Sequence, residues 1–70
     1  MPAPTLRTDH AAAQAILVNM TQVRAVTLRQ FQRATKAAGI RPSTFAVWNA
    51  VNAGLIKRIG HGIYQRGSEQ

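Results

Sequence analysis

The sequence predicts a mainly α-helical domain with a small β-hairpin, and three observations lead to this fold class. Apolar residues recur at spacings of three and four across residues 13–53, which is the period of a helix that packs on one side. Capping signals divide this stretch into three helices. Residues 55–66 then have the composition of two short strands around a glycine-containing loop. We therefore expect three helices followed by a hairpin.

The first helix is predicted to follow a Pro-containing arm, residues 1–7, which has little to bury and is expected to be flexible. Thr8 or Asp9 can cap this helix. Its inward face is expected to carry the apolar residues at helical spacing, Ala13, Ile16, Leu17, Met20 and Val23. The residues expected to face away are Gln14, Val18 and Thr21. The composition of residues 24–26 predicts a short strand that joins the sheet.

The second helix is predicted to start at Leu28. Thr27 and Gln30 fit a capping box, in which each side chain satisfies a backbone N–H near the helix start. One face gathers the residues expected to be buried, Leu28, Phe31, Ala34, Thr35 and Ala38. The opposite face gathers the cations Arg29, Arg33 and Lys36. Gly39 is expected to end the helix in a left-handed conformation, so that Ile40 folds back onto it.

The third helix is predicted to span residues 44–53. Ser43 supplies its N-cap and Gly54 ends it, while Pro42 lacks a backbone N–H and therefore fits a helix start. The residues expected to face inward are Phe45, Trp48 and either Val51 or Asn52. The residues expected to face outward are Ala46, Val47, Asn49 and Ala50.

The C-terminal hairpin is predicted to consist of strands at residues 55–59 and 63–66. The loop between them, residues 60–62, is Gly-His-Gly and has the backbone freedom that a tight turn needs. Four side chains are expected to hold the hairpin on the domain, Ile56, Ile59, Ile63 and Tyr64. Residues 67–70 form a polar tail that we expect to be flexible, so the folded domain is predicted to span residues 8–66.

Residues 34–48 resemble a helix-turn-helix unit. Such units carry a glycine in the turn, then an aliphatic residue, then apolar anchors along the second helix, and the corresponding residues are Gly39, Ile40, Phe45 and Trp48. The family usually has alanine where this chain has Thr35. The segment AGLIKRIGHGIYQRG is similar to the winged-helix modules at the N-termini of abortive-infection antitoxin regulators. The resemblance covers roughly two-thirds of the chain and implies a winged helix-turn-helix, three helices plus a wing, as in small phage and plasmid repressors.

The charge of the chain favours a nucleic-acid partner. Nine Lys and Arg against two Asp and Glu in 70 residues give a formal net charge of +7, which attracts polyanions. Together with the resemblance, this charge predicts a DNA-binding protein, a repressor-like transcriptional regulator of a phage, plasmid or bacterial defence operon. We expect double-stranded DNA as its partner and a location in the cytoplasm, at the nucleoid.

The predicted DNA-binding residues lie on the second helix, the turn, the third helix and the wing. Phosphate contacts are expected from Arg29, Arg33, Lys36, Arg41, Lys57 and Arg58. Ser43 and Thr44 either contact a phosphate or base edge, or only cap the third helix. Asn49 is expected to pair with adenine, and Val47 to meet a thymine methyl group. His61 at the wing tip either enters a minor groove or only shapes the turn.

Two other functions remain open on the sequence alone. The outward face expected for the third helix is rich in alanine and has no Lys or Arg, so it suits docking of a protein partner. The basic surface also suits structured RNA. Whichever partner it binds, the apolar stripe of the first helix predicts a symmetric homodimer.

Catalysis is not expected, because the only carboxylate side chains are Asp9 and Glu69, one near each end of the chain. The chain has no Cys, and His10 and His61 have no neighbours with metal-ligand spacing. We therefore expect neither a metal nor another cofactor. No segment is long and apolar enough to predict a membrane span.

Overall fold

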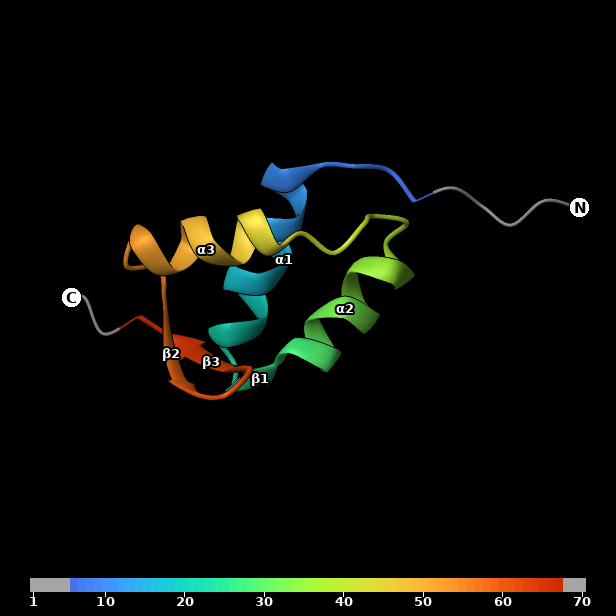
Figure 1. Cartoon of the computed structure of the whole chain (residues 1–70). Helices are drawn as coiled ribbons and strands as arrows, with labels where there is room; N and C mark the ends of the chain where they lie inside the picture. The colour runs from blue at the N-terminus through green and yellow to red at the C-terminus, as the bar shows by residue number, and fades with distance from the viewer. Residues whose placement is uncertain (1–5, 68–70) are drawn as a thin grey trace, which may run out of the picture.

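The computed structural model describes residues 6–67, and within them it contains three α-helices and three β-strands (Figure 1). The elements are, in order, α1 (His10–Thr21), β1 (Val26–Thr27), α2 (Leu28–Ala37), α3 (Thr44–Asn52), β2 (Ile56–Gly60) and β3 (Ile63–Arg66). The predicted three helices and hairpin are confirmed. The predicted short strand is also present, at Val26–Thr27 rather than at residues 24–26, and it adds a third strand to the hairpin. The fold is therefore α+β rather than mainly α.

The three-stranded sheet ties the hairpin to the start of α2. Its strand order is β1-β3-β2, and β3 pairs antiparallel with both neighbours. Val26 of β1 lies opposite Tyr64 of β3. The turn between β2 and β3 contains Gly62 at φ 68°, and its carbonyl accepts a hydrogen bond of 2.8 Å from the N–H of Leu28. A backbone N–H that has no partner inside α2 is thus satisfied by the hairpin turn.

The core lies where α1 meets the other two helices and the sheet. α1 contacts α2, α3, β1 and β3, and Figure 1 shows α3 crossing in front of α1 with α2 to one side. The buried apolar side chains are Ala13, Leu17, Val26, Phe31, Ile40, Ala46, Val47, Ala50 and Ile56. Three of these nine are alanines, so the core depends on close approach of the elements as well as on large side chains.

The C-terminal end of α1 differs from the prediction. The helix ends at Thr21, so Val23 lies beyond it and is 76% exposed instead of buried. Thr21 was expected to face away, but it is buried and its hydroxyl donates a hydrogen bond of 2.8 Å to the carbonyl of Val18. This hydrogen bond removes most of the cost of burying a hydroxyl. Val18, also expected to face away, is half-buried against the core.

Both predicted caps of α2 are confirmed. The hydroxyl of Thr27 accepts a hydrogen bond of 3.1 Å from the N–H of Gln30, and the side chain of Gln30 accepts one of 2.9 Å from the N–H of Thr27. After the helix, Gly39 has φ 74°. The N–H of Ile40 then donates to the carbonyl of Thr35 at 2.8 Å, which brings the buried Ile40 back onto the helix.

α3 faces the opposite way from the prediction. Phe45 and Trp48 were expected in the core, and they are 55% and 63% exposed. Ala46, Val47 and Ala50 were expected on the surface, and all three are buried. The helix is present with nearly the predicted bounds, so the error concerns which side of it faces the core.

The contact between α1 and α3 explains this orientation. Ala13 of α1 and Ala46 and Ala50 of α3 have no solvent-exposed area. Small side chains at a helix contact let the two axes approach closely, whereas a Phe or Trp at the same place would hold the helices apart. The side of α3 with small residues therefore faces α1, and the aromatic side is left in solvent.

Backbone hydrogen bonds hold both ends of the described chain. The N–H of Arg7, which the sequence assigned to the arm, donates to the turn after α2 at 3.0 Å. The N–H of Gly67, which the sequence assigned to the tail, donates to the carbonyl of Leu55 at 3.0 Å. The rest of the predicted arm, residues 1–5, and of the predicted tail, residues 68–70, lie outside the described residues.

Candidate nucleic-acid interface

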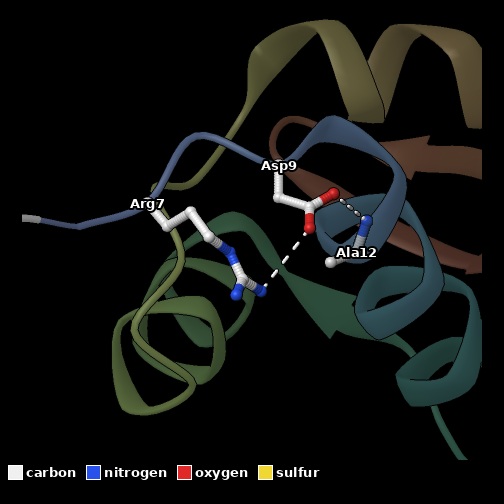
Figure 2. Close-up of polar contacts among 3 residues, drawn as sticks. All are labelled: Arg7, Asp9 and Ala12. Carbon is white, nitrogen blue, oxygen red and sulfur yellow. Dashed lines mark hydrogen bonds and ion pairs between the residues drawn. The ribbon is translucent and has the colours of Figure 1, made fainter.

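The basic side chains are all on the surface. Each of the nine Lys and Arg residues is exposed. Between residues 6 and 67 the only acidic residue is Asp9, whose Oδ2 lies 3.5 Å from Nη2 of Arg7. Figure 2 shows this pair, and also the hydrogen bond of 3.0 Å that the other carboxylate oxygen accepts from the N–H of Ala12 as the N-cap of α1. The other eight cations have no acidic partner in this part of the chain.

The α2 stripe consists of the three exposed cations Arg29, Arg33 and Lys36. Their spacing of four and three places them on one side of α2. Phe31 and Thr35 point into the core from the other side and are buried, as predicted. Two residues expected to be buried with them are exposed instead, Leu28 and Ala38. Burial of an unpaired charge is costly. The helix therefore turns the side with Phe31 and Thr35 into the core, and the α2 stripe on the opposite side stays in solvent.

The hairpin turn lies beside the start of the α2 stripe. The hydrogen bond from the N–H of Leu28 to the carbonyl of Gly62 fixes the turn at the first residue of α2, and Arg29 is the next residue. In Figure 1 the turn between β2 and β3 lies near the start of α2. The two elements expected to contact phosphates are therefore neighbours.

The cations of the hairpin are exposed, and one of them is held by the turn. Lys57 and Arg58 are both exposed on β2. Nε of Arg58 donates a hydrogen bond of 3.2 Å to the carbonyl of Gly60, and its Nη2 lies 3.5 Å from Nδ1 of His61. The guanidinium of Arg58 and the exposed imidazole of His61 therefore occupy the hairpin turn together.

Ile59 does not hold the hairpin on the domain as predicted, because it is 47% exposed. Residues three apart on a strand point to opposite faces, so the burial of Ile56 by itself directs Ile59 outward. The pairing register also shifts between Arg58 and Gly60, which makes Ile59 the extra residue of a bulge. The other residues expected to hold the hairpin are buried or half-buried, Ile56, Ile63 and Tyr64.

The turn between α2 and α3 is fixed by the chain that precedes α1. The N–H of Arg7 donates to the carbonyl of Gly39, and the N–H of Arg41 donates to the carbonyl of Arg7 at 2.8 Å. The backbone of Arg41 is thus fixed, while its side chain is exposed. Arg41 therefore presents a cation just before the N-terminus of α3.

The N-terminus of α3 is capped within the chain. Oγ of Ser43 accepts a hydrogen bond of 3.0 Å from the N–H of Ala46. Nδ1 of His10 lies 2.7 Å from the same Oγ, and the His10 ring meets the Phe45 ring edge-on, with centroids 5.2 Å apart. Ser43 is therefore a capping residue, whereas Thr44 next to it is exposed. A hollow of ≈ 200 Å³ beside this cap is lined by Thr8, His10, Arg41, Pro42, Ser43 and Thr44.

The aromatic face of α3, defined by Phe45 and Trp48, replaces the outward face that the sequence predicted. Burial removes Val47 from the predicted base contacts, and Asn49 is only half-buried and keeps partial access to solvent. The Ala-rich face proposed for a protein partner is inside the domain. The sequence contained one indication of this orientation, because Ala46 and Ala50 are one helical turn apart on the same side.

The expected homodimer depends on an exposed apolar stripe on α1. In the structure this stripe packs inside the domain. Ala13 and Leu17 are fully buried by other elements of the same chain. A different apolar surface is open to solvent, a groove of ≈ 450 Å³ between the end of α1 and α2. The residues that line this groove are Met20, Val23, Arg24, Val26, Gln30, Arg33, Ala34 and Ala37.

Other kinds of site receive no support from the described part of the chain. Within residues 6–67 there is no group of three or more His, Asp or Glu side chains that is placed to bind a metal ion. In the same range no helix has both the length and the hydropathy needed to cross a bilayer. Comparisons with protein-family models, curated proteins and solved structures find no match to this chain.

Proposed function

We propose that this chain is a winged helix-turn-helix protein that binds duplex DNA and regulates transcription of a phage, plasmid or bacterial defence operon. The order α1-β1-α2-α3-β2-β3, with β1 at the edge of the hairpin, is compatible with that layout. In this proposal the β2–β3 hairpin is the wing. The choice of operon rests on the resemblance of the chain to the winged-helix modules of abortive-infection antitoxin regulators.

One observation carries the proposal: the α2 stripe begins beside the hairpin turn, and neither element has an acidic partner within the described residues. The hydrogen bond from the N–H of Leu28 to the carbonyl of Gly62 joins the hairpin turn to the first residue of α2. A row of exposed cations without acidic partners on two adjacent elements suits a phosphate backbone, because each contact releases a counterion. In the proposed complex the contacting cations are Arg29, Arg33, Lys36, Arg41, Lys57 and Arg58.

Salt dependence tests the proposal. With six phosphate contacts, affinity for random duplex DNA is expected to fall about 10³-fold between about 50 and 200 mM salt. Arg33→Ala should weaken binding to all sequences alike and lower the slope of log affinity against log salt by about one. Arg66→Ala is the matched control, because it removes the same charge from the open end of the hairpin, opposite Ile56. A flat salt dependence, or normal binding by Arg33→Ala, would contradict the proposal.

A chemical-shift map with the same duplex locates the contact surface. We expect the largest shifts at α2, at the turn around Arg41 and at the β2–β3 turn. Shifts confined to Met20 and Val23, on the α1 side of the groove and away from α2, would instead favour a protein-binding module, which is the second candidate function. That candidate is favoured by the apolar lining of this groove and by the 76% exposure of Val23.

A further inference from the structure

We propose that the aromatic face of α3 stacks on unpaired bases, so that this protein prefers DNA with an opened segment to a fully paired duplex. The inference rests on the proposed DNA-binding function, and it names the kind of DNA that the site prefers. Its starting point is the exposure of Phe45 and Trp48, two large rings that the core does not use.

The two rings belong to one surface. Phe45 and Trp48 are three residues apart in a helix, which places them on the same side, and more than half of each side chain is open to solvent. The His10 ring stands edge-on to Phe45 at an interplanar angle of 67°, so the Phe45 ring has a partner along one side. The domain therefore presents two neighbouring rings to whatever covers this face.

The charges around this face favour a nucleic acid as the occupant. α3 itself has no charged residue, Arg41 is exposed just before the helix, and Lys57 is exposed shortly after it. A second copy of this chain would bring another net charge of +7 to the contact. A polyanion whose backbone runs between cations, with its bases on the aromatic rings, matches both the charged and the apolar parts of the surface.

The same face suits unpaired bases better than the edges of a paired duplex. Reading of base edges in a major groove uses Arg, Lys, Asn or Gln, and the side chains of that kind on α3 are Asn49, which is half-buried, and Asn52, which is exposed at the last residue of the helix. Aromatic rings instead stack on the faces of bases, and those faces are open only where the bases are unpaired or unstacked. Stacking of this kind tolerates any base sequence.

Trp48 provides the measurement, because it is the only tryptophan in the chain. Three probes are compared at one salt concentration: an oligothymidine strand, a fully paired duplex, and the same duplex with a central unpaired bubble. We expect quenching of Trp48 fluorescence and tighter binding with the single strand and the bubble. Equal affinity for the bubble and the paired duplex, or binding of the bubble without quenching, would overturn the inference and leave the duplex proposal intact.

Variants of Phe45 test the role of its ring while Trp48 still reports binding. Phe45→Ala should weaken binding to the bubble and the single strand by about fivefold or more and leave duplex binding unchanged. Phe45→Leu keeps an apolar side chain without a ring and should lose the same preference. Ile59→Ala, an exposed apolar side chain on β2, is the matched control and should bind all three probes normally. Normal bubble binding by Phe45→Ala would overturn the inference.

The remaining outcomes also separate the two proposals. If no DNA binds and an acidic amphipathic peptide quenches Trp48, both the proposed function and the stacking inference are wrong. If Arg33→Ala weakens binding to all three probes while Phe45→Ala affects only those with unpaired bases, both stand. Circular dichroism of each variant confirms that it is folded, which we expect because Phe45 and Ile59 are exposed.

Discussion

α2 and α3 are consecutive helices of similar length, each capped by a hydroxyl side chain, yet the sequence predicted the buried face of only one of them. In α2 the cations and the buried residues lie on opposite sides, as expected. In α3 the residues expected inside are exposed and those expected outside are buried. The difference lies in the free energy that each helix would lose if its opposite side faced the core.

α2 has a large penalty for the wrong orientation. Turning it over would bring Arg29, Arg33 and Lys36 into the core without acidic partners, and burial of unpaired charges costs several kcal/mol each. α3 contains only apolar and neutral polar side chains, so no charge opposes either orientation. The inward face of α3 is set by how closely its side chains pack against α1, and the size of a side chain alone does not predict how well it packs there. Charge separation therefore predicts a buried face better than side-chain volume does.

The largest expected effect compares the two phenylalanines. Phe31 of α2 is 1% exposed, so Phe31→Ala should lower the free energy of unfolding by about 3–5 kcal/mol. Phe45 of α3 is 55% exposed, so Phe45→Ala should lower it by about 1 kcal/mol or less. Urea denaturation followed by circular dichroism measures both. Phe31→Leu serves as a milder variant that keeps more of the protein folded, and equal losses at the two positions would contradict the assigned orientation of α3.

Enlarging an alanine tests the close contact of α1 and α3. Ala50 has no exposed area, so Ala50→Leu should overpack this contact and destabilise the protein by about 1–3 kcal/mol. Ala53→Leu, at an exposed position just after the same helix, is the control and should change stability little. Thermal unfolding distinguishes the two variants. A neutral Ala50→Leu would mean that the small side of α3 does not face α1.

The N-caps give a smaller effect of similar size in both helices. Thr27→Ala removes half of the capping box of α2, and Ser43→Ala removes the acceptor for the N–H of Ala46. Each substitution should cost about 1 kcal/mol. Ser43→Ala also removes the partner of His10, so we expect its loss to be at least as large. Thermal unfolding with Thr27→Ser and Ser43→Thr as controls measures the caps, since both controls retain a hydroxyl.

The smallest effect on folding is expected at the hairpin. Lys57 and Arg58 are exposed, so the double variant Lys57→Ala, Arg58→Ala should unfold at nearly the same urea concentration as the parent protein. It should nevertheless weaken DNA binding in a gel-shift assay, because two proposed phosphate contacts are lost. Tyr64→Ala is the opposite control. Tyr64 is half-buried against the core, so its truncation should lower the free energy of unfolding, in contrast to the double variant. Normal DNA binding by the double variant would remove the hairpin from the proposed interface.

The local elements of this protein followed from short-range sequence features. The capping box at Thr27 and Gln30, the left-handed Gly39 and the left-handed Gly62 of the hairpin turn each involve residues close in sequence, and each was predicted, whereas Gly60 belongs to β2 rather than to the predicted loop. The α2 stripe also followed from the sequence, because its phase is set by charges on the helix itself. Of the candidate site, the exposed cations were thus predictable.

Features that depend on long-range packing were decided only by the tertiary structure. The inward face of α3 depends on its contact with α1, where Ala13 is more than thirty residues away in the sequence. The hydrogen bond from the N–H of Arg41 to the carbonyl of Arg7 joins two segments far apart in the sequence, and no local sequence pattern predicts it. The physical reason is the same in each case. Where neither charge nor backbone conformation makes one arrangement costly, the arrangement is set by how well the side chains pack against the neighbouring element.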